Sequence, residues 1–154
     1  MKKIVFFVLF LLLVGCVPKM DSNGELARDY LLEKGYSVKS YEGSYIYSVN
    51  RQELVEMPHI SIWARQTVSP ESYIGKDIIQ EIFIVKNHPV IKINGTKVEV
   101  RVFIFDGQII GGTSYPAEDG VVGWGYSLEG KTAEEVQNNN LDGWIAEWNK
   151  KYGQ

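Results

Sequence analysis

Residues 96–112, TKVEVRVFIFDGQIIGG, carry the strongest β-sheet pattern of the chain. From Thr96 to Phe105, valine and isoleucine alternate with charged and aromatic residues, which is typical of a strand with one buried face. Asp106-Gly107 is a typical two-residue hairpin turn, because both residue types tolerate positive φ. Gln108 to Gly112 continues as the returning strand. The core-facing residues of the first strand are predicted to be Val98, Val100, Val102 and Ile104. The opposite face begins charged and ends aromatic, so we expect it to be partly covered at its end.

Residues upstream of this hairpin predict further strands. Ile78 to Lys86 is almost entirely apolar or β-branched, which predicts a buried strand. Val90 to Ile93 is expected to pair with the strand that starts at Thr96, through a turn at Asn94-Gly95. Earlier strands are predicted at residues 36–41 and 45–49, as a hairpin around Gly43, and at residues 59–65.

Helices are predicted at both ends of the domain. Ser22 and Glu25 have capping-box spacing before a one-sided apolar stripe, and Gly35 is placed as a left-handed C-cap, which predicts a helix from Gly24 to Lys34. Near the C-terminus, Thr132 and Glu135 repeat the capping-box spacing, and three asparagines, 138–140, end that short helix.

The last predicted helix, from Asp142 to Tyr152, has its apolar residues at steps of three and four. These residues are Leu141, Trp144, Ile145, Trp148 and Tyr152. We interpret the stripe mainly as the face that docks this helix on the sheet. The predicted fold class is therefore α+β, an antiparallel sheet of hairpins packed with an N-terminal helix and C-terminal helices.

The first residues of the chain are typical of a signal for export. Lys2 and Lys3 precede an uninterrupted apolar run from Ile4 to Val14. As a helix this run would span roughly 16 Å, which is too short to cross about 30 Å of hydrocarbon. A basic start followed by a short apolar run is the pattern of a secretory signal peptide.

The end of this run, Leu13-Val14-Gly15-Cys16, resembles the lipobox of bacterial lipoproteins. The resemblance implies that Cys16 receives a diacylglyceryl group, that a dedicated peptidase cuts before it, and that the protein is held at the extracytoplasmic face of the cell membrane. The implied organisation is a signal peptide (1–15), a lipidated cysteine with a short spacer (16–23) and one α+β domain (24–154). An ordinary secretory signal and an uncleaved N-terminal helix remain the alternatives.

Three properties of the chain agree with this anchor. Cys16 is the only cysteine, so a disulfide within the chain is excluded. Val17 to Asn23 can span at most about 25 Å, which places the domain close to the membrane. Without Lys2 and Lys3, 14 basic and 19 acidic residues remain, a formal net charge of −5. This charge argues against nucleic acid as a partner and against electrostatic adhesion to anionic lipid, so the attached lipid must provide the tether.

Four further runs, together with the lipobox, resemble small uncharacterised lipoproteins of Gram-positive bacteria. They are YIGK at 73–76, KNHP at 86–89, DGQIIGG at 106–112 and GKT at 130–132. The resemblance covers most of the chain. It implies an envelope location and a compact α+β domain, but it supplies no catalytic residues.

Common catalytic patterns are missing from the sequence. An acylated Cys16 cannot serve as a nucleophile, and the chain has no Gly-x-Ser-x-Gly element. His59 and His88 are 29 positions apart and no second ligand stands at metal-binding spacing, so we predict no metal site and no cofactor. Glu118 and Asp119 lie in a glycine-flanked loop, which we interpret as solvated.

Four residues are candidate ligand contacts. Asn87 and His88 precede Pro89 between two strand patterns, where we favour hydrogen bonds to the local backbone over a catalytic role for His88. Trp124 lies between two glycines and belongs to no apolar stripe. Tyr115 follows Gly111-Gly112-Thr113-Ser114, where small residues would let a ligand approach the backbone.

These features predict a membrane-anchored, non-catalytic binding or accessory module of the cell envelope. The expected partner is an envelope protein or a cell-wall ligand. Two alternatives stay open: an envelope hydrolase that uses His88 with loop carboxylates, and an inhibitory or structural module that contacts a protein through an exposed sheet edge.

Overall fold

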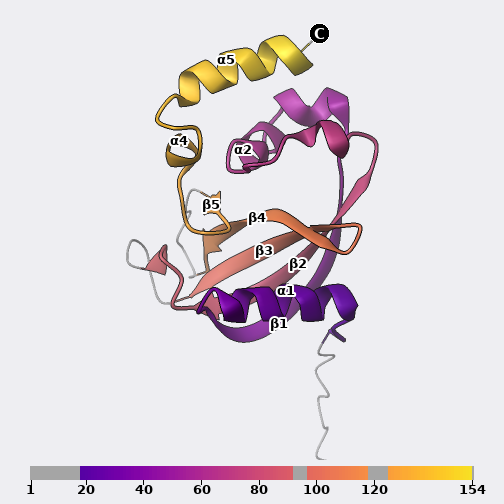
Figure 1. Ribbon diagram of the computed structural model, residues 1–154, viewed down its shortest axis with the longest axis vertical. Coiled ribbons are helices and arrows are strands. Elements are labelled where there is room, and N and C mark those ends of the chain that lie inside the picture. Colours follow the sequence, from indigo (N-terminus) through magenta and orange to yellow (C-terminus); the bar gives the residue numbers. More distant parts are fainter. Residues whose placement is uncertain (1–17, 92–96, 118–124, 154) are drawn as a thin grey trace, which may run out of the picture.

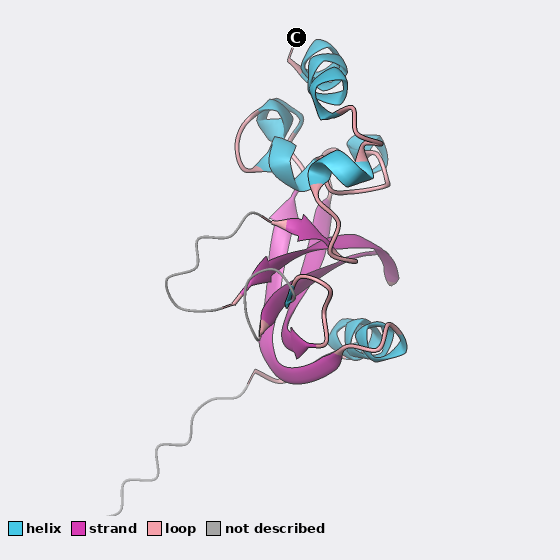
Figure 2. Ribbon diagram, turned by 90° about the vertical axis from the view of Figure 1, so that its left-hand side faces the viewer, coloured by secondary structure: helices cyan, strands magenta, loops and turns pink. Residues whose placement is uncertain are grey.

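The computed structural model describes residues 18–91, 97–117 and 125–153. The lipobox with Cys16, the turn at Asn94-Gly95, the acidic pair Glu118 and Asp119, and Trp124 lie outside these ranges. Helix α1 (Ser22–Glu33) lies along a five-stranded sheet, and the C-terminal helices gather at the far end of the molecule (Figure 1). The side view shows the same separation of α1 from the C-terminal helices (Figure 2). The predicted α+β class is confirmed.

The sheet is an antiparallel meander. Its strands are β1 (Ser37–Ser48), β2 (Asp77–Lys86), β3 (Val98–Phe105), β4 (Gln108–Pro116) and β5 (Tyr126–Ser127), in the spatial order β1-β2-β3-β4-β5. The hairpin predicted at β3 and β4 is confirmed. Its turn residues Asp106 and Gly107 both have positive φ, 51° and 69°, as a two-residue turn requires.

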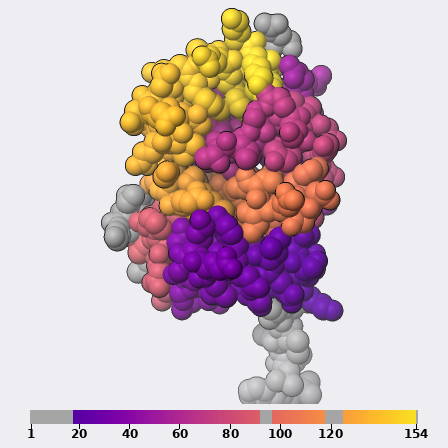
Figure 3. Space-filling model, viewed as in Figure 1, coloured from indigo at the N-terminus to yellow at the C-terminus, as the bar shows by residue number. Residues whose placement is uncertain are grey.

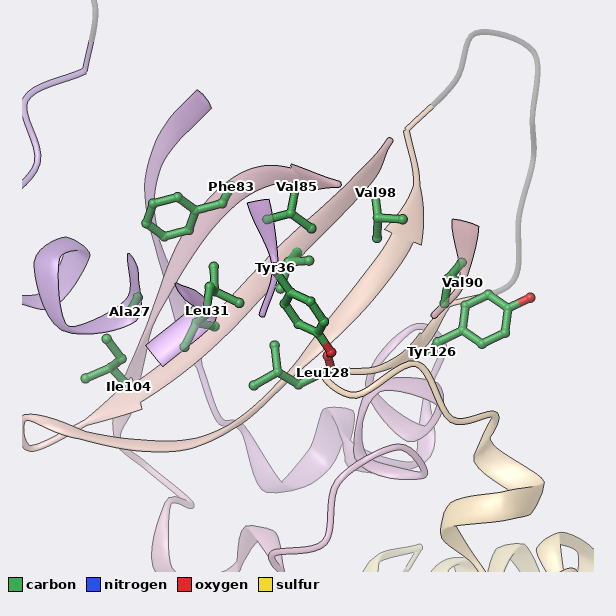
Figure 4. Close-up of a cluster of buried hydrophobic side chains, with 12 residues drawn as sticks. Ala27, Leu31, Tyr36, Phe83, Val85, Val90, Val98, Ile104, Tyr126 and Leu128 are labelled. Atoms are coloured by element: carbon green, nitrogen blue, oxygen red, sulfur yellow. The ribbon is translucent and has the colours of Figure 1, made fainter. Parts of the chain in front are cut away.

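The first hydrophobic core lies between α1 and the sheet (Figure 4). Val98, Val100, Val102 and Ile104 of β3 are all buried, as predicted. Ala27 and Leu31 of α1 pack against this face, and both are fully buried. Their spacing of four residues places them on one side of the helix.

The ends of α1 confirm one expected cap and correct the other. Gly35 has a φ of 82°, so the predicted left-handed C-cap is confirmed. The N-cap is Asp21 rather than Ser22, because the Asp21 carboxylate accepts hydrogen bonds from the backbone N–H groups of Asn23 and Gly24. The helix therefore begins at Ser22, two residues earlier than predicted.

Residues 36–49 do not form the predicted hairpin. Instead, Ser37–Ser48 forms the single long strand β1, which pairs with β2 along its whole length. Gly43 has a φ of 113° and lies beside a register shift between Tyr41 and Gly43, so it belongs to a β-bulge instead of a turn. β1 is an edge strand, on which Tyr45 and Ile46 are 65% and 70% exposed.

Residues 51–72 form short helices in place of the predicted strand at 59–65. They are η1 (Arg51–Val55), α2 (His59–Trp63) and η2 (Pro70–Ser72). The Ala64 N–H donates to the Ile60 carbonyl at 2.9 Å, which is a helical bond. The strand predicted at 90–93 is also absent where it is described, because Val90 lies in a turn.

The C-terminal helices begin and end where expected. α4 (Ala133–Val136) has the predicted capping box between Thr132 and Glu135. Asn138 and Asn139 then adopt positive φ and end it. Helix α5 (Leu141–Tyr152) follows.

The docking of α5 differs from the prediction. The Trp148 Nε1–H donates to the Leu54 carbonyl of η1 at 2.8 Å, so α5 packs mainly on η1 rather than directly on the sheet. Trp148 and Trp63 belong to a second core, which reaches Ile78 and Phe103 of the sheet. Phe103 is 1% exposed, in agreement with the expected cover at the end of β3. In the space-filling view the C-terminal segment, coloured yellow, forms the end of the molecule opposite the indigo α1 (Figure 3).

None of the helices in the described ranges is long and apolar enough to cross a membrane.

Candidate functional site

An apolar pocket of about 420 Å³ lies among α2, α4, α5 and the start of β5. We call it the helical pocket. Its apolar walls include Met57, Ile60, Ala64, Leu141, Trp144 and Ile145. The volume falls in the range of about 300–1,000 Å³ that is usual for small-molecule sites.

Arg65 lines the helical pocket and follows Ala64, the C-cap of α2. It is 7% exposed. Its Nε–H donates to the Gly125 carbonyl, and its Nη1 donates to the Ser61 carbonyl and hydroxyl. Within the described ranges, Nη2 has no hydrogen-bond partner and no carboxylate lies within ion-pair distance of the guanidinium. Burial lowers the pKa of Arg65 below its ordinary value, because the charged form is desolvated.

Aromatic stacking holds the wall that α5 contributes. The rings of Trp144 and Trp148 stack with centroids 4.5 Å apart, and Tyr152 meets Trp148 edge-on at the same distance. Trp144 alone of these three lines the helical pocket, while Trp148 and Tyr152 are buried behind it. The stripe predicted from the sequence therefore serves mainly as core and exposes one ring to the pocket.

His88 lies inside the first core and not on the surface. It is 2% exposed, and its Nδ1 accepts the Val90 N–H at 3.2 Å. With Nδ1 as an acceptor, Nε2 carries the proton and donates to the Leu128 carbonyl at 3.1 Å. Both ring nitrogens are thus bonded to backbone, so His88 is neither a ligand contact nor a free acid or base. The bond to Val90 is of the local kind that the sequence favoured for His88, whereas the bond to Leu128 joins residues 40 positions apart.

Burial makes His88 a source of acid sensitivity. Desolvation lowers the pKa of the folded-state imidazole below its ordinary value of 6.5, so the unfolded chain binds a proton first as the pH falls. Stability is full above about pH 6.5 and declines below it, by at most about 1.4 kcal/mol per pH unit for one proton. In urea titrations between about pH 7.5 and pH 5, we expect a His88→Gln chain to lose less stability on acidification than the wild type. Parallel pH profiles would contradict this assignment.

The remaining candidate contacts do not share one site. Asn87 is exposed with a φ of 64°, which a turn before Pro89 explains. Tyr115 is half-buried, and the Arg101 guanidinium lies 5.3 Å from the centre of its ring. Neither residue lines the helical pocket. Trp124 lies outside the described residues.

The glycines of β4 admit a side chain of the same protein. Gln66 Oε1 accepts the Gly112 N–H at 3.0 Å, and Gln66 Nε2 donates to the Gly112 carbonyl at 3.1 Å. A Cβ at Gly111 would lie 2.3 Å from Gln66 Oε1, and the φ of 147° there also favours glycine. Gln66 therefore ties the end of α2 to the sheet at the position where we expected a ligand.

A second hydrogen-bonded group surrounds His59, which the sequence had placed in a strand. The Trp63 Nε1–H donates to the Tyr47 hydroxyl at 3.1 Å, and that hydroxyl donates to His59 Nδ1 at 3.0 Å. His59 Nε2 lies 3.6 Å from a Glu53 oxygen. Burial raises the pKa of Tyr47 to about 12. These hydrogen bonds link α2 to β1. The described ranges contain no cluster of three or more metal-ligating side chains.

The sequence analysis did not single out Arg65, which it placed only as the last residue of the strand predicted at 59–65. Four apolar residues among the six before it were the available signal that it enters an apolar environment.

Comparisons of the chain with protein-family models, with curated proteins and with solved structures found no match.

Proposed function

We propose that the protein is a lipid-anchored, non-catalytic binding module on the outer face of the cytoplasmic membrane, and that its ligand occupies the helical pocket. The observation that carries the binding role is the pocket itself, with apolar walls and one buried cation. The lipobox resemblance supports the anchor. The anchored position rests on the sequence alone, and the binding role on the structure.

The short link to the membrane fits such a role. Five residues, 17–21, separate Cys16 from the start of α1, and fully extended they span at most about 18 Å. Met20, within this link, already packs against the first core. A lipid on Cys16 would therefore keep the domain within reach of molecules at the membrane surface.

The hydrolase alternative loses its main support. It required His88 to exchange protons with a substrate, and both nitrogens of that ring are bonded to backbone inside the core. The protein-docking alternative would use the exposed edge strand β1 instead of the pocket.

Native mass spectrometry of the full chain extracted from bacterial membranes tests the proposed pocket. We expect a small-molecule adduct on the wild type and its loss in Ala133→Trp, because Ala133 lines the pocket and an indole there would fill part of it. Ala146→Trp is the matched control, since Ala146 is exposed on α5 and does not line the pocket. No adduct on any chain, or an adduct that Ala133→Trp retains, would contradict the proposed site.

A further inference from the structure

We infer that the helical pocket takes an amphipathic monocarboxylate, a molecule with an apolar body and a single carboxylate, and that Arg65 receives the carboxylate. The inference rests on the proposed function and adds the chemical class of the ligand.

The buried guanidinium of Arg65 carries a positive charge that favours an anionic ligand. Its partners in the described ranges are the carbonyls of Gly125 and Ser61 and the Ser61 hydroxyl. These groups are neutral, and no carboxylate of the described ranges forms an ion pair with the guanidinium. Burying a charge without an opposite charge is costly, and the lowered pKa of this guanidinium reflects the same cost. An anion in the pocket would remove the imbalance.

The donors that remain on Arg65 limit the form of the anion. Nε and Nη1 are already bonded to the protein, which leaves Nη2 with two N–H groups. The two N–H groups of this one nitrogen can donate hydrogen bonds to a single carboxylate. A larger polyanion, such as a diphosphate, would need several donors, and Arg65 is the only Arg, Lys or His among the described residues that line the helical pocket.

The other ionisable groups of the lining also favour one negative charge. Glu134 lines the pocket from α4 and is exposed, whereas Arg65 is buried. A second anionic group at the exposed side would meet the Glu134 carboxylate and be repelled. Tyr126, from β5, contributes a buried phenol.

The walls define the rest of the ligand. Ile60, Leu141 and Ile145 offer aliphatic surface, and Trp144 offers an indole. Burying the apolar atoms of a ligand against these walls is favourable. The walls offer few hydrogen-bond partners for hydroxyl or amide groups of a ligand. A sugar or a polar peptide would lose hydrogen bonds to water here, so an alkyl or aryl body fits better.

Titration calorimetry on the full chain in non-ionic detergent tests the assignment. The probes are 3-phenylpropanoate and its uncharged amide, 3-phenylpropanamide, which share one apolar body. We expect the carboxylate to bind at least about tenfold more tightly, since hydrogen bonds to an ionised group are the strong ones. Arg65→Met should remove this preference, so that the two probes bind with equal affinity, while Arg65→Lys should keep part of it. Ala133→Trp should weaken both probes, and Ala146→Trp neither.

The two wild-type affinities decide the inference even where Arg65→Met fails to fold, which circular dichroism would show. Equal affinities for the two probes, or no binding of either, would overturn the carboxylate assignment. A preference for the carboxylate that Arg65→Met retains in a folded chain would overturn the role of Arg65. The pocket as a binding site is judged separately, by whether Ala133→Trp removes the adduct seen in native mass spectrometry.

Discussion

Replacing Trp148 by alanine is expected to lower the free energy of unfolding by about 3–5 kcal/mol. The indole is 7% exposed, stacks on Trp144 and meets Tyr152 edge-on. Its Nε1–H also satisfies the Leu54 carbonyl of η1. Alanine would leave a cavity between α5 and η1 and remove the partner of that carbonyl. Urea denaturation of the full chain, followed by circular dichroism, measures the change.

The variant Trp148→Phe distinguishes the contribution of the aromatic ring to stability from that of the hydrogen bond. Phenylalanine keeps an aromatic ring in the stack but cannot donate to Leu54, so we expect a smaller loss of about 1–3 kcal/mol. A loss below about 1 kcal/mol for Trp148→Ala would mean that α5 does not depend on this contact, because buried tryptophans normally cost far more to truncate.

Replacing Cys16 by serine is expected to abolish lipid attachment completely. The proposed acylation needs the thiol of Cys16, and the chain has no other cysteine to replace it. In cells fed radiolabelled palmitate, the label on the protein should fall to background, and the precursor should keep residues 1–15. Ser22→Ala is the control, because Ser22 follows the lipobox by six positions and does not cap α1. Unchanged labelling of the Cys16→Ser chain would contradict the anchor.

Several elements that local sequence signals define were predicted correctly, although the cap expected at Ser22 and the strand expected to begin at Val90 were not. β3 and β4 combine alternating side chains with a turn dipeptide, so pattern and turn chemistry agree. The capping box at Thr132 and the helical periodicity of α5 are also local, since each depends on residues within one or two turns.

The wrong predictions concern elements whose conformation depends on distant partners. Gly43 is compatible with a turn or a bulge. It lies in a bulge because β1 pairs with β2 on both sides of it. The short apolar run at 59–65 is compatible with a strand or a helix. In the structure residues 59–63 are helical, and Trp63 at the end of this helix packs in the second core.

The candidate site was harder to predict because burial is not local. His88 and Arg65 are both polar residues beside apolar segments, and nothing near them in sequence shows that both are buried. Leu128 and Gly125, which accept their hydrogen bonds, lie 40 and 60 positions away. The helical pocket likewise joins residues 57–65 to residues 125–145, so only the folded chain defines it.

Mass spectrometry of the N-terminal peptide, from protein extracted from bacterial membranes, tests most directly whether this domain works at the membrane surface. We predict a mature chain that starts at Cys16 and carries the mass of a diacylglyceryl group on its sulfur. A free thiol at Cys16, in protein recovered from the medium or the cytosol, would contradict the account.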